Sequence, residues 1–213
     1  MIVLSSEELL AMNGLIDGAP IDGIQLNASD EPEENRLIKL KESLTEKGFL
    51  TNNELNDKFM VTAKLLKLYK LSDHKVYINN LRIALVENDY AIVLDVLPSH
   101  EVSFSRVPRI TIIKKYIEAA EFLRKGQKAK FFDYDKESFS EAEFEEELDS
   151  KEWDNFMVVQ THKKKALTIF KAYYFDDQEA HCYDYIKKVK QQRGAKDFRM
   201  DLLDILEINI GGE

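Results

Sequence analysis

Residues 75–97 read KVYINNLRIALVENDYAIVLDVL, three runs rich in Val, Ile, Leu and Tyr that are separated by polar pairs. Runs of β-branched and aromatic residues of this length favour strands. The pairs Asn79-Asn80 and Asn88-Asp89 suit two-residue hairpin turns, because Asn and Asp tolerate a positive φ. The stretch therefore predicts an antiparallel meander. Its strands are expected at 75–78, 81–87, 90–97 and 101–105.

The residues before this meander predict helices. Residues 5–14 begin with two serines followed by two glutamates, and they end in a glycine, which predicts one short helix. Leu37, Leu40 and Leu44 then recur on one helical face. Thr51 has a glutamate three residues later, a capping box that predicts the start of a second long helix. The apolar stripe expected for that helix consists of Leu55, Phe59, Thr62, Leu66 and Tyr69.

The residues after the meander repeat its order of strands followed by a helix. A helix is expected at 108–124, strands at 155–161, 166–175 and 181–188, and a final helix at 197–207. We therefore predict a single α+β domain over residues 1–213, made of two related halves at 1–126 and 155–213. In it, mostly antiparallel strands form one central sheet or two packed sheets flanked by helices.

An acidic segment at 133–154 joins the two halves. It holds 11 acidic residues against 2 basic ones, which equals the net charge of −9 of the whole chain. Ser140 and Glu143 have the spacing of a capping box, and Phe144 and Leu148 lie one helical turn apart. The segment therefore predicts a short amphipathic helix. Its charge argues against a broad phosphate-binding surface, so we expect no nucleic-acid partner.

The composition indicates a cytoplasmic globular protein. The apolar run at 90–97 is far shorter than the roughly 18 residues that span a bilayer. No basic segment precedes an apolar one at the N-terminus, as it would in a signal peptide. Cys182 is the only cysteine, so no internal disulfide can form. We expect no insertion into membranes.

The residue types that usually carry catalysis or bind cofactors form no recognisable pattern. The histidines lack the i, i+4 pairing of helical metal sites; they are His74, His100, His162 and His181. His181 and Cys182 are neighbours in a predicted strand, so their side chains point to opposite faces. There is no glycine-rich phosphate loop and no Gly-X-Ser-X-Gly turn. We expect no catalytic residue, no metal, no cofactor and no enzymatic activity.

One alternative is a winged-helix DNA-binding regulator over residues 33–105, because two helices followed by a hairpin also describe that module. The second helix would then read DNA. Its start is rich in amide and acidic side chains, where Arg, Lys or Ser would be needed; these residues are Asn52, Asn53, Glu54, Asn56 and Asp57. A protein-binding function is therefore the preferred hypothesis.

Several short stretches, in their order along the chain, resemble the EspG-type chaperones of the type VII (ESX) secretion system. They are IVLSSEEL at 2–9, ESLTEKGFL at 42–50, NELN at 53–56, AIVL at 91–94 and VSF at 102–104. The resemblance covers the first half of the chain best, up to the helix from Ile110. In particular, the sequence resembles the shorter, uncharacterised EspG-like proteins associated with such systems in Gram-positive bacteria.

This resemblance implies a quasi-twofold α/β architecture. It also implies a cytosolic chaperone that binds a specific helical secretion substrate and keeps it soluble for export. In the family a long loop between two central strands helps to grip the substrate. Here the corresponding connection is only Asn79-Asn80, which departs from the family pattern.

We predict that the partner contacts the hairpin ends of the central sheet and the acidic segment. A shortened loop leaves the sheet more open to an approaching helix, and a segment of charge −9 would steer a basic partner. The predicted contact residues are Asn79, Asn80, Asn88, Asp89, Glu143, Glu145, Glu146, Glu147 and Asp149.

Overall fold

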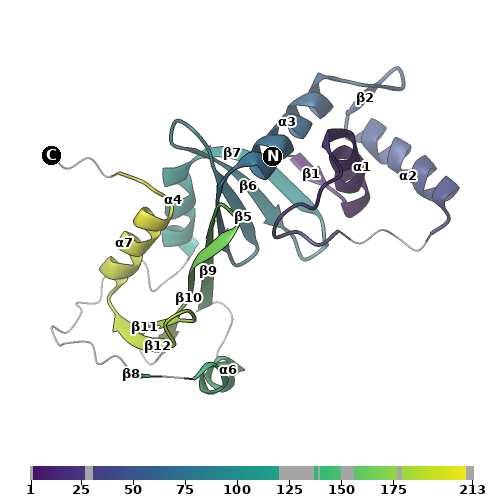
Figure 1. Cartoon of the computed structure of the whole chain (residues 1–213). Coiled ribbons are helices and arrows are strands. Elements are labelled where there is room, and N and C mark those ends of the chain that lie inside the picture. Colours follow the sequence, from purple (N-terminus) through teal and green to yellow (C-terminus); the bar gives the residue numbers. More distant parts are fainter. Residues whose placement is uncertain are drawn as a thin grey trace.

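The chain forms one antiparallel sheet of ten strands within the part that the computed structural model describes (Figure 1). The described residues are 2–26, 31–119, 137–138, 140–149, 156–176 and 179–209. Among these, the side chains of 116–119, 137–138, 147–149, 175–176 and 179 are not described.

The predicted meander is present in the first half of the chain. Its strands are β4 (His74–Ile78), β5 (Leu81–Leu85), β6 (Tyr90–Val96) and β7 (Val102–Pro108). Asn79, Asn88 and Asp89 have φ angles of 49°, 60° and 59°, so the hairpin turns use the positive φ that their residue types predict. A three-residue strand, β1 (Ile2–Leu4), pairs with β7 at one edge of the sheet.

The second half of the chain contributes a second meander. Its strands are β9 (Phe156–Lys163), β10 (Ala166–Asp176), β11 (Glu179–Asp184) and β12 (Val189–Arg193), with the short strand β8 (Glu137–Ser138) paired to β12. The strand expected at 181–188 is wrong in its bounds. The Asp184 carboxylate accepts hydrogen bonds from the N–H groups of Ile186 and Lys187, and this turn separates β11 from β12.

The two meanders meet at the centre of the sheet. The strand order is β1-β7-β6-β5-β4-β9-β10-β11-β12-β8, with β4 and β9 antiparallel neighbours. In chain order, each half contains a short edge strand, one or more helices that pack on the sheet, four strands and a final helix. The closing helices are α4 (Arg109–Ala119) and α7 (Ala195–Ile205). The predicted α+β class, with its antiparallel sheet, flanking helices and quasi-twofold order, is confirmed.

Helices α1 (Ser6–Ile16) and α2 (Glu33–Glu46) precede the first meander. Ser5 caps α1 and forms a capping box with Glu8, because its hydroxyl accepts from the Glu8 N–H while the Glu8 carboxylate accepts from the Ser5 N–H. The expected end of this helix at Gly14 is wrong. The helix continues to Ile16, and Gly18, with φ of 65°, donates its N–H to the Asn13 carbonyl.

Helix α3 (Asp57–Leu71) begins later than the sequence predicted. The expected start at Thr51 is wrong, because residues 50–55 form a small hairpin of β2 (Leu50–Thr51) and β3 (Glu54–Leu55). Asn56 is the N-cap instead, and its side-chain oxygen accepts from the N–H groups of Lys58 and Phe59. Gly48, just after the C-cap of α2, is in the left-handed conformation with φ of 69°.

The core lies on both faces of the sheet. One face is buried against α4 and α7 and takes residues from both halves, such as Ile83 from β5 and Tyr173 from β10. On the other face, α1, α2 and α3 cover the first half, while α6 (Glu141–Asp149) covers the second (Figure 1). In the described ranges, none of the helices combines the length and the apolar content that a membrane-spanning segment needs.

Candidate functional site

The predicted contact residues Asn79 and Asn80 form the turn between β4 and β5, and both make structural bonds. The side-chain oxygen of Asn79 accepts from the Val158 N–H at 2.8 Å, and the Asn79 N–H donates to the Val158 carbonyl at 3.1 Å. The side-chain amide of Asn80 donates to the Asp95 carboxylate. Asn79 thus ties the turn to β9. The connection between β4 and β5 is therefore this two-residue turn and not a long loop.

Asn88 and Asp89 lie at the opposite end of β5 from this first turn. They form the tight turn between β5 and β6. A hydrogen bond that the Val86 N–H donates to the Tyr90 carbonyl at 3.1 Å closes this turn. Because β5 joins the two turns, they point to opposite ends of the sheet. The four hairpin residues therefore do not form one contiguous tip.

The acidic contact residues lie on α6, on the outer part of the second half. Glu143 accepts from the Ser140 N–H at 2.8 Å and from its hydroxyl at 2.6 Å, which confirms the predicted capping box. These hydrogen bonds lower the pKa of Glu143. Glu145 and Glu146 are exposed. The side chains of Glu147 and Asp149 fall outside the described part, although their backbone is helical.

Phe144 attaches α6 to the sheet. Its ring is buried and stacks on Tyr183 with ring centroids 4.1 Å apart, and it also contacts Tyr174 and Tyr185. The described carboxylates of α6, those of Glu141, Glu143, Glu145 and Glu146, are exposed. Helix α6 packs on β10 and β11, and Phe156, whose carbonyl accepts from the Asn79 side-chain amide at 3.3 Å, packs against the same aromatic cluster (Figure 1).

A second apolar stripe on α3 marks a different candidate site. Four members of the stripe predicted from the sequence are buried: Phe59, Thr62, Leu66 and Tyr69. The fifth, Leu55, was wrongly included, because it lies in β3 and is exposed. A further set of apolar residues lies on another side of the same helix, at the i, i+4, i+7 and i+10 spacing of one helical face. These residues are Val61, Leu65, Leu68 and Leu71. Helix α3 is thus apolar on two faces, and the described residues leave Val61, Leu68 and Leu71 of the second face exposed.

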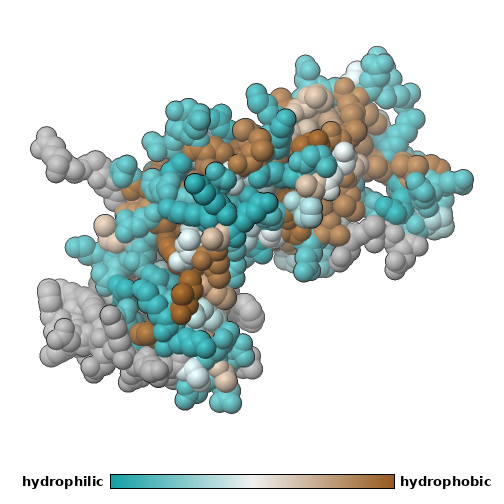
Figure 2. All heavy atoms as spheres, viewed as in Figure 1, coloured by the Kyte–Doolittle hydropathy of each residue, from teal (hydrophilic) through white to brown (hydrophobic). Residues whose placement is uncertain are grey.

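This second stripe forms one wall of a groove with a volume of about 950 Å³. Val61 is 57% exposed and Leu71 is 68% exposed. The opposite wall comes from the end of the β5–β6 hairpin, with Val86 and Asn88 among the lining residues. Figure 2 shows hydrophobic surface gathered over α1 and α3 on the visible face. Of the predicted contact residues, Asn88 is the one that lines this groove.

A polar junction closes one end of the groove. Arg109 donates to the carbonyls of Val86 at 2.7 Å and Tyr90 at 3.3 Å, and its guanidinium lies 3.7 Å from the Glu207 carboxylate. The His74 Nδ1 lies 2.9 Å from the same carboxylate. The junction therefore links β4, α4 and the end of α7.

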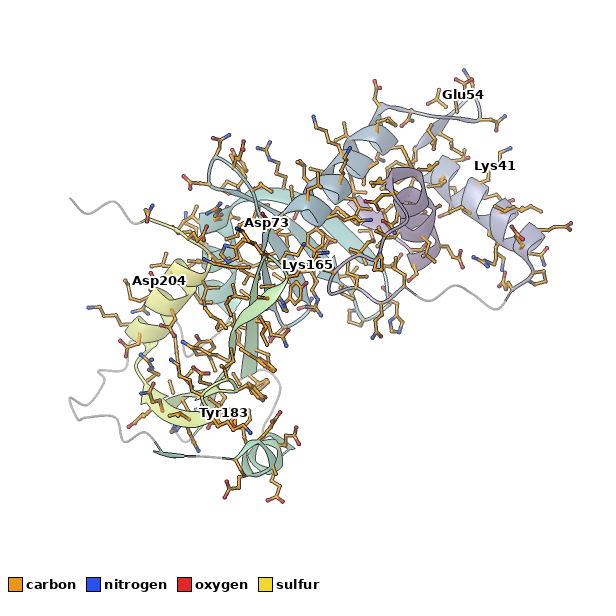
Figure 3. The ribbon with its side chains drawn as sticks, viewed as in Figure 1. Lys41, Glu54, Asp73, Lys165, Tyr183 and Asp204 are labelled. Atoms are coloured by element: carbon orange, nitrogen blue, oxygen red, sulfur yellow. The ribbon has the colours of Figure 1, made fainter. Side chains whose placement is uncertain are left out.

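The second meander also reaches this junction. Lys163 of β9 lies 3.2 Å from the Glu207 carboxylate. The Lys164 N–H donates to the Asp73 carbonyl at 2.7 Å, so the β9–β10 turn is tied to the α3–β4 connection. Asp73 and Lys165 are drawn close together in Figure 3. The groove end is therefore held by both halves of the chain.

Burial and charge shift the pKa values at this junction. Burial lowers the pKa of His74, and the Glu207 carboxylate offsets only part of that effect. For Glu207 burial would raise the pKa, but the hydrogen bond from Lys163 and the charges of His74, Lys163 and Arg109 outweigh it and lower the pKa. A neutral His74 beside an ionised Glu207 is therefore the favoured state near neutral pH.

The described residues hold no cluster of three or more His, Cys, Asp or Glu side chains that is suited to a metal ion. Cys182 is buried, as expected, and burial raises the pKa of its thiol to about 12. A thiol with that pKa is a poor nucleophile at neutral pH. The groove itself offers apolar surface and fixed charges, which suit binding better than bond-making chemistry.

The sequence analysis predicts only one apolar stripe on this helix, and it therefore does not predict the groove. The signal was present, since Val61, Leu65 and Leu68 also follow helical spacing. The opposite wall could not be found in this way. It depends on where the β5–β6 hairpin ends relative to α3, which is a tertiary relation.

Comparison with known proteins identifies a family, and the family description names no activity. A family model described as a domain of unknown function (DUF5081) matches residues 3–211. Among curated proteins, none matches the chain. The matched range includes both meanders and all of the groove.

Proposed function

The chain belongs to the DUF5081 family, and from this premise we propose that it is a binding protein without enzymatic activity that holds a helical segment of another protein in the α3 groove. The observation that carries the proposal is an apolar face of α3 that the described residues leave exposed, opposite the wall formed by the end of the β5–β6 hairpin. Monomeric proteins rarely leave such an apolar surface without a partner.

A helix is the ligand that this groove fits best. The stripe from Val61 to Leu71 spans eleven residues, whose ten steps cover about 15 Å of helix at a rise of 1.5 Å per residue. An amphipathic helix of about three turns matches that length and presents apolar residues at the same spacing. The apolar side chains of such a helix would pack between the side chains of the stripe.

We further propose that the partner is a secretion substrate and that the protein is a cytoplasmic, EspG-like chaperone of a type VII (ESX) system. The quasi-twofold order of the chain, with two four-stranded meanders each closed by a helix, agrees with the architecture that the resemblance implies and so supports this proposal. The short Asn79-Asn80 turn requires that the substrate is held differently from the loop-gripped substrates of that family, and the α3 groove offers the alternative.

The winged-helix hypothesis gains no support from the arrangement of the strands. A wing is a hairpin that is free to approach DNA. Strands β4 and β5 lie in the middle of the sheet instead, with β9 on one side and β6 on the other. The start of α3 directly follows the β2–β3 hairpin, and the Asn56 side chain caps the helix there.

The proposal is tested by purifying the protein from its native host and identifying what co-elutes. We expect a protein with a predicted amphipathic helix. The variant Val61→Glu should lose this partner, because it places a charge in the apolar wall. Met60→Glu is the matched control, since Met60 is 58% exposed on the same helix but does not line the groove. Loss of the partner with both variants, or with neither, would refute the groove as the binding site.

A further inference from the structure

We propose that a pocket in the second half of the chain binds the phosphate group of a small molecule. The pocket has a volume of about 210 Å³ and shares no lining residue with the α3 groove. Cations from three elements line it, namely Lys171 of β10, Lys187 of the β11–β12 turn and Arg193 of β12. This site goes beyond the proposed function and does not depend on it.

Strand register places part of the pocket lining on the core side of the sheet. Arg193 is paired with Ala180, and Gln191 is paired with Cys182. Paired residues, and residues two positions apart on a strand, point to the same face of a sheet. Ala180 and Cys182 belong to the buried cluster that includes Phe198 of α7. Gln191 and Arg193 are therefore polar side chains on the face that carries the core, where polar groups need polar contacts.

Arg193 lacks such contacts. Within the part of the chain that the structure describes, its guanidinium makes no ion pair, and its buried Nε has no hydrogen-bond acceptor. Buried N–H groups nearly always have an acceptor, from the protein or from a bound molecule. The forked guanidinium matches the spacing of two phosphate oxygens. An anion in the pocket would therefore supply the acceptors that Arg193 lacks.

Two ammonium groups add to the charge of Arg193. The Lys187 side chain is 76% exposed, and its ammonium lies 3.7 Å from the Asp184 carboxylate. An exposed pair of this kind contributes little, so Lys187 can exchange it for a ligand at small cost. Lys171 lies 3.1 Å from the Asp201 carboxylate of α7. Each lysine thus has one carboxylate beside it, and the positive charge of Arg193 is in excess.

The two carboxylates near the pocket also accept hydrogen bonds from other donors. Asp184 accepts from the N–H groups of Ile186 and Lys187 at 3.1 Å and 3.0 Å. Asp201 accepts from the Tyr173 hydroxyl at 3.0 Å. These hydrogen bonds stabilise the two negative charges where they are, so that neither carboxylate depends on the pocket cations alone and both lysines can share their charge with a ligand.

A single phosphate group suits the pocket in size and in shape. The volume of about 210 Å³ lies below the roughly 300–1,000 Å³ of pockets for drug-sized ligands, so the site holds one small group and no nucleic-acid backbone. Donors that come from three elements suit a tetrahedral phosphate, which has more acceptor oxygens than a flat carboxylate. Cys182 also lines the pocket, and burial raises the pKa of its thiol to about 12, so it adds no negative charge.

The test is a titration of the purified full chain with inorganic phosphate at constant ionic strength, followed by isothermal titration calorimetry and by the melting temperature. A ligand that binds the folded chain raises its melting temperature. We expect saturable binding of phosphate and none of acetate. Phosphate also stabilises proteins by exclusion from their surface, and this effect is the same for all variants. The variants therefore decide between the two causes.

Arg193→Gln should raise the dissociation constant for phosphate about tenfold, because it removes a charged donor. Lys187→Gln should raise it about threefold, since that ammonium is exposed. Lys188→Gln is the matched control, because Lys188 is exposed in the same turn but does not line the pocket. It should bind phosphate as the wild type does. Circular dichroism confirms that each variant is folded.

Three results would overturn the site. An equal response of the wild type and Arg193→Gln would show that phosphate acts through the solvent alone. Equal effects of Lys187→Gln and Lys188→Gln would show that only the net charge matters. Acetate that binds as tightly as phosphate would refute the class of ligand. Val61→Glu, which alters the α3 groove, should bind phosphate as the wild type does, so this site and the proposed function stand or fall separately.

Discussion

Glu8 shows how a single side chain joins two helices. It is buried, and its carboxylate accepts from the Ser5 N–H at 2.6 Å, the Ser43 hydroxyl at 2.7 Å and the Lys47 ammonium at 2.7 Å. Burial alone would raise the pKa of Glu8, but these hydrogen bonds and the charge of Lys47 lower it. The sequence indicated a role for Glu8 at the start of α1. The partners on α2 are 35 and 39 residues away, so no local pattern predicts them.

We expect Glu8→Gln to destabilise the protein by about 1–3 kcal/mol. The substitution removes the charge opposite Lys47 and replaces one of the two oxygens that accept from Ser5, Ser43 and Lys47 with an amide NH2 group, which can only donate. Urea denaturation followed by circular dichroism measures the change in the free energy of unfolding. Glu46→Gln is the control, because Glu46 is an exposed carboxylate on α2. Equal effects of the two substitutions would show that the Glu8 contacts contribute nothing to stability.

We also expect stability to fall as the pH drops below about 6.5. Burial lowers the pKa of His74 and of His162 from the usual value of 6.5. The unfolded chain therefore takes up protons in this range that the folded chain does not, and proton uptake by the unfolded state lowers the free energy of unfolding. Urea midpoints at pH 7.5 and 5.5 measure the loss.

The control for this pH effect is a variant with both histidines replaced, His74→Asn with His162→Asn. It should lose less stability between pH 7.5 and 5.5 than the wild type. The lowered pKa values of Glu8 and Glu207 act in the same direction, but their effect begins only near the usual glutamate value of 4.5. An unchanged pH dependence in the double variant would contradict the assignment to these histidines.

At the scale of elements, the sequence predicted those strands and turns whose structure is set by the residue types within a few positions. The meander followed from Asn79 and Asn88-Asp89, whose residue types set the turns. The position of β12 could not be predicted, because VKQQR has neither apolar alternation nor β-branched enrichment beyond Val189. It is a strand because β11 supplies its hydrogen-bond partners. The α3 groove likewise depends on tertiary placement.

The start of α3 gives a sharp test of helix capping. Asn56→Ala should cost about 0.5–2 kcal/mol, because it removes the side-chain oxygen that accepts the N–H groups of Lys58 and Phe59. Glu54→Ala should cost little, since Glu54 is exposed in β3 (Figure 3) and caps no helix. The reverse order of the two effects in thermal or urea unfolding would favour the capping box at Thr51.

For the whole molecule, the continuous sheet argues that the two halves fold together. The β4–β9 pair joins them, and one core cluster contains side chains from both, including Val76 and Val159. The Glu207 junction adds ion pairs to His74 and Lys163. Neither half can bury its central strand without the other.

We therefore expect a single cooperative unfolding transition. Far-ultraviolet circular dichroism should report the same urea midpoint as near-ultraviolet signals from the tyrosines, which lie in both halves. Val159→Ala in β9 should lower both midpoints together. Two separate transitions, or a variant that shifts one signal alone, would mean that the halves are independent folding units.

The short strand β1 has a further consequence for solubility. It pairs only with Val102–Phe104, although β7 continues to Pro108. In the described structure, the rest of β7 therefore forms the edge of the sheet without a neighbouring strand. An open edge invites intermolecular strand pairing and amyloid-like aggregation. Arg106 and Pro108 sit on the remaining part, where a charge and a missing N–H both hinder such pairing. Removing residues 2–4 would uncover the unguarded apolar part of β7, and such a truncated chain should form thioflavin-positive aggregates sooner than the intact chain.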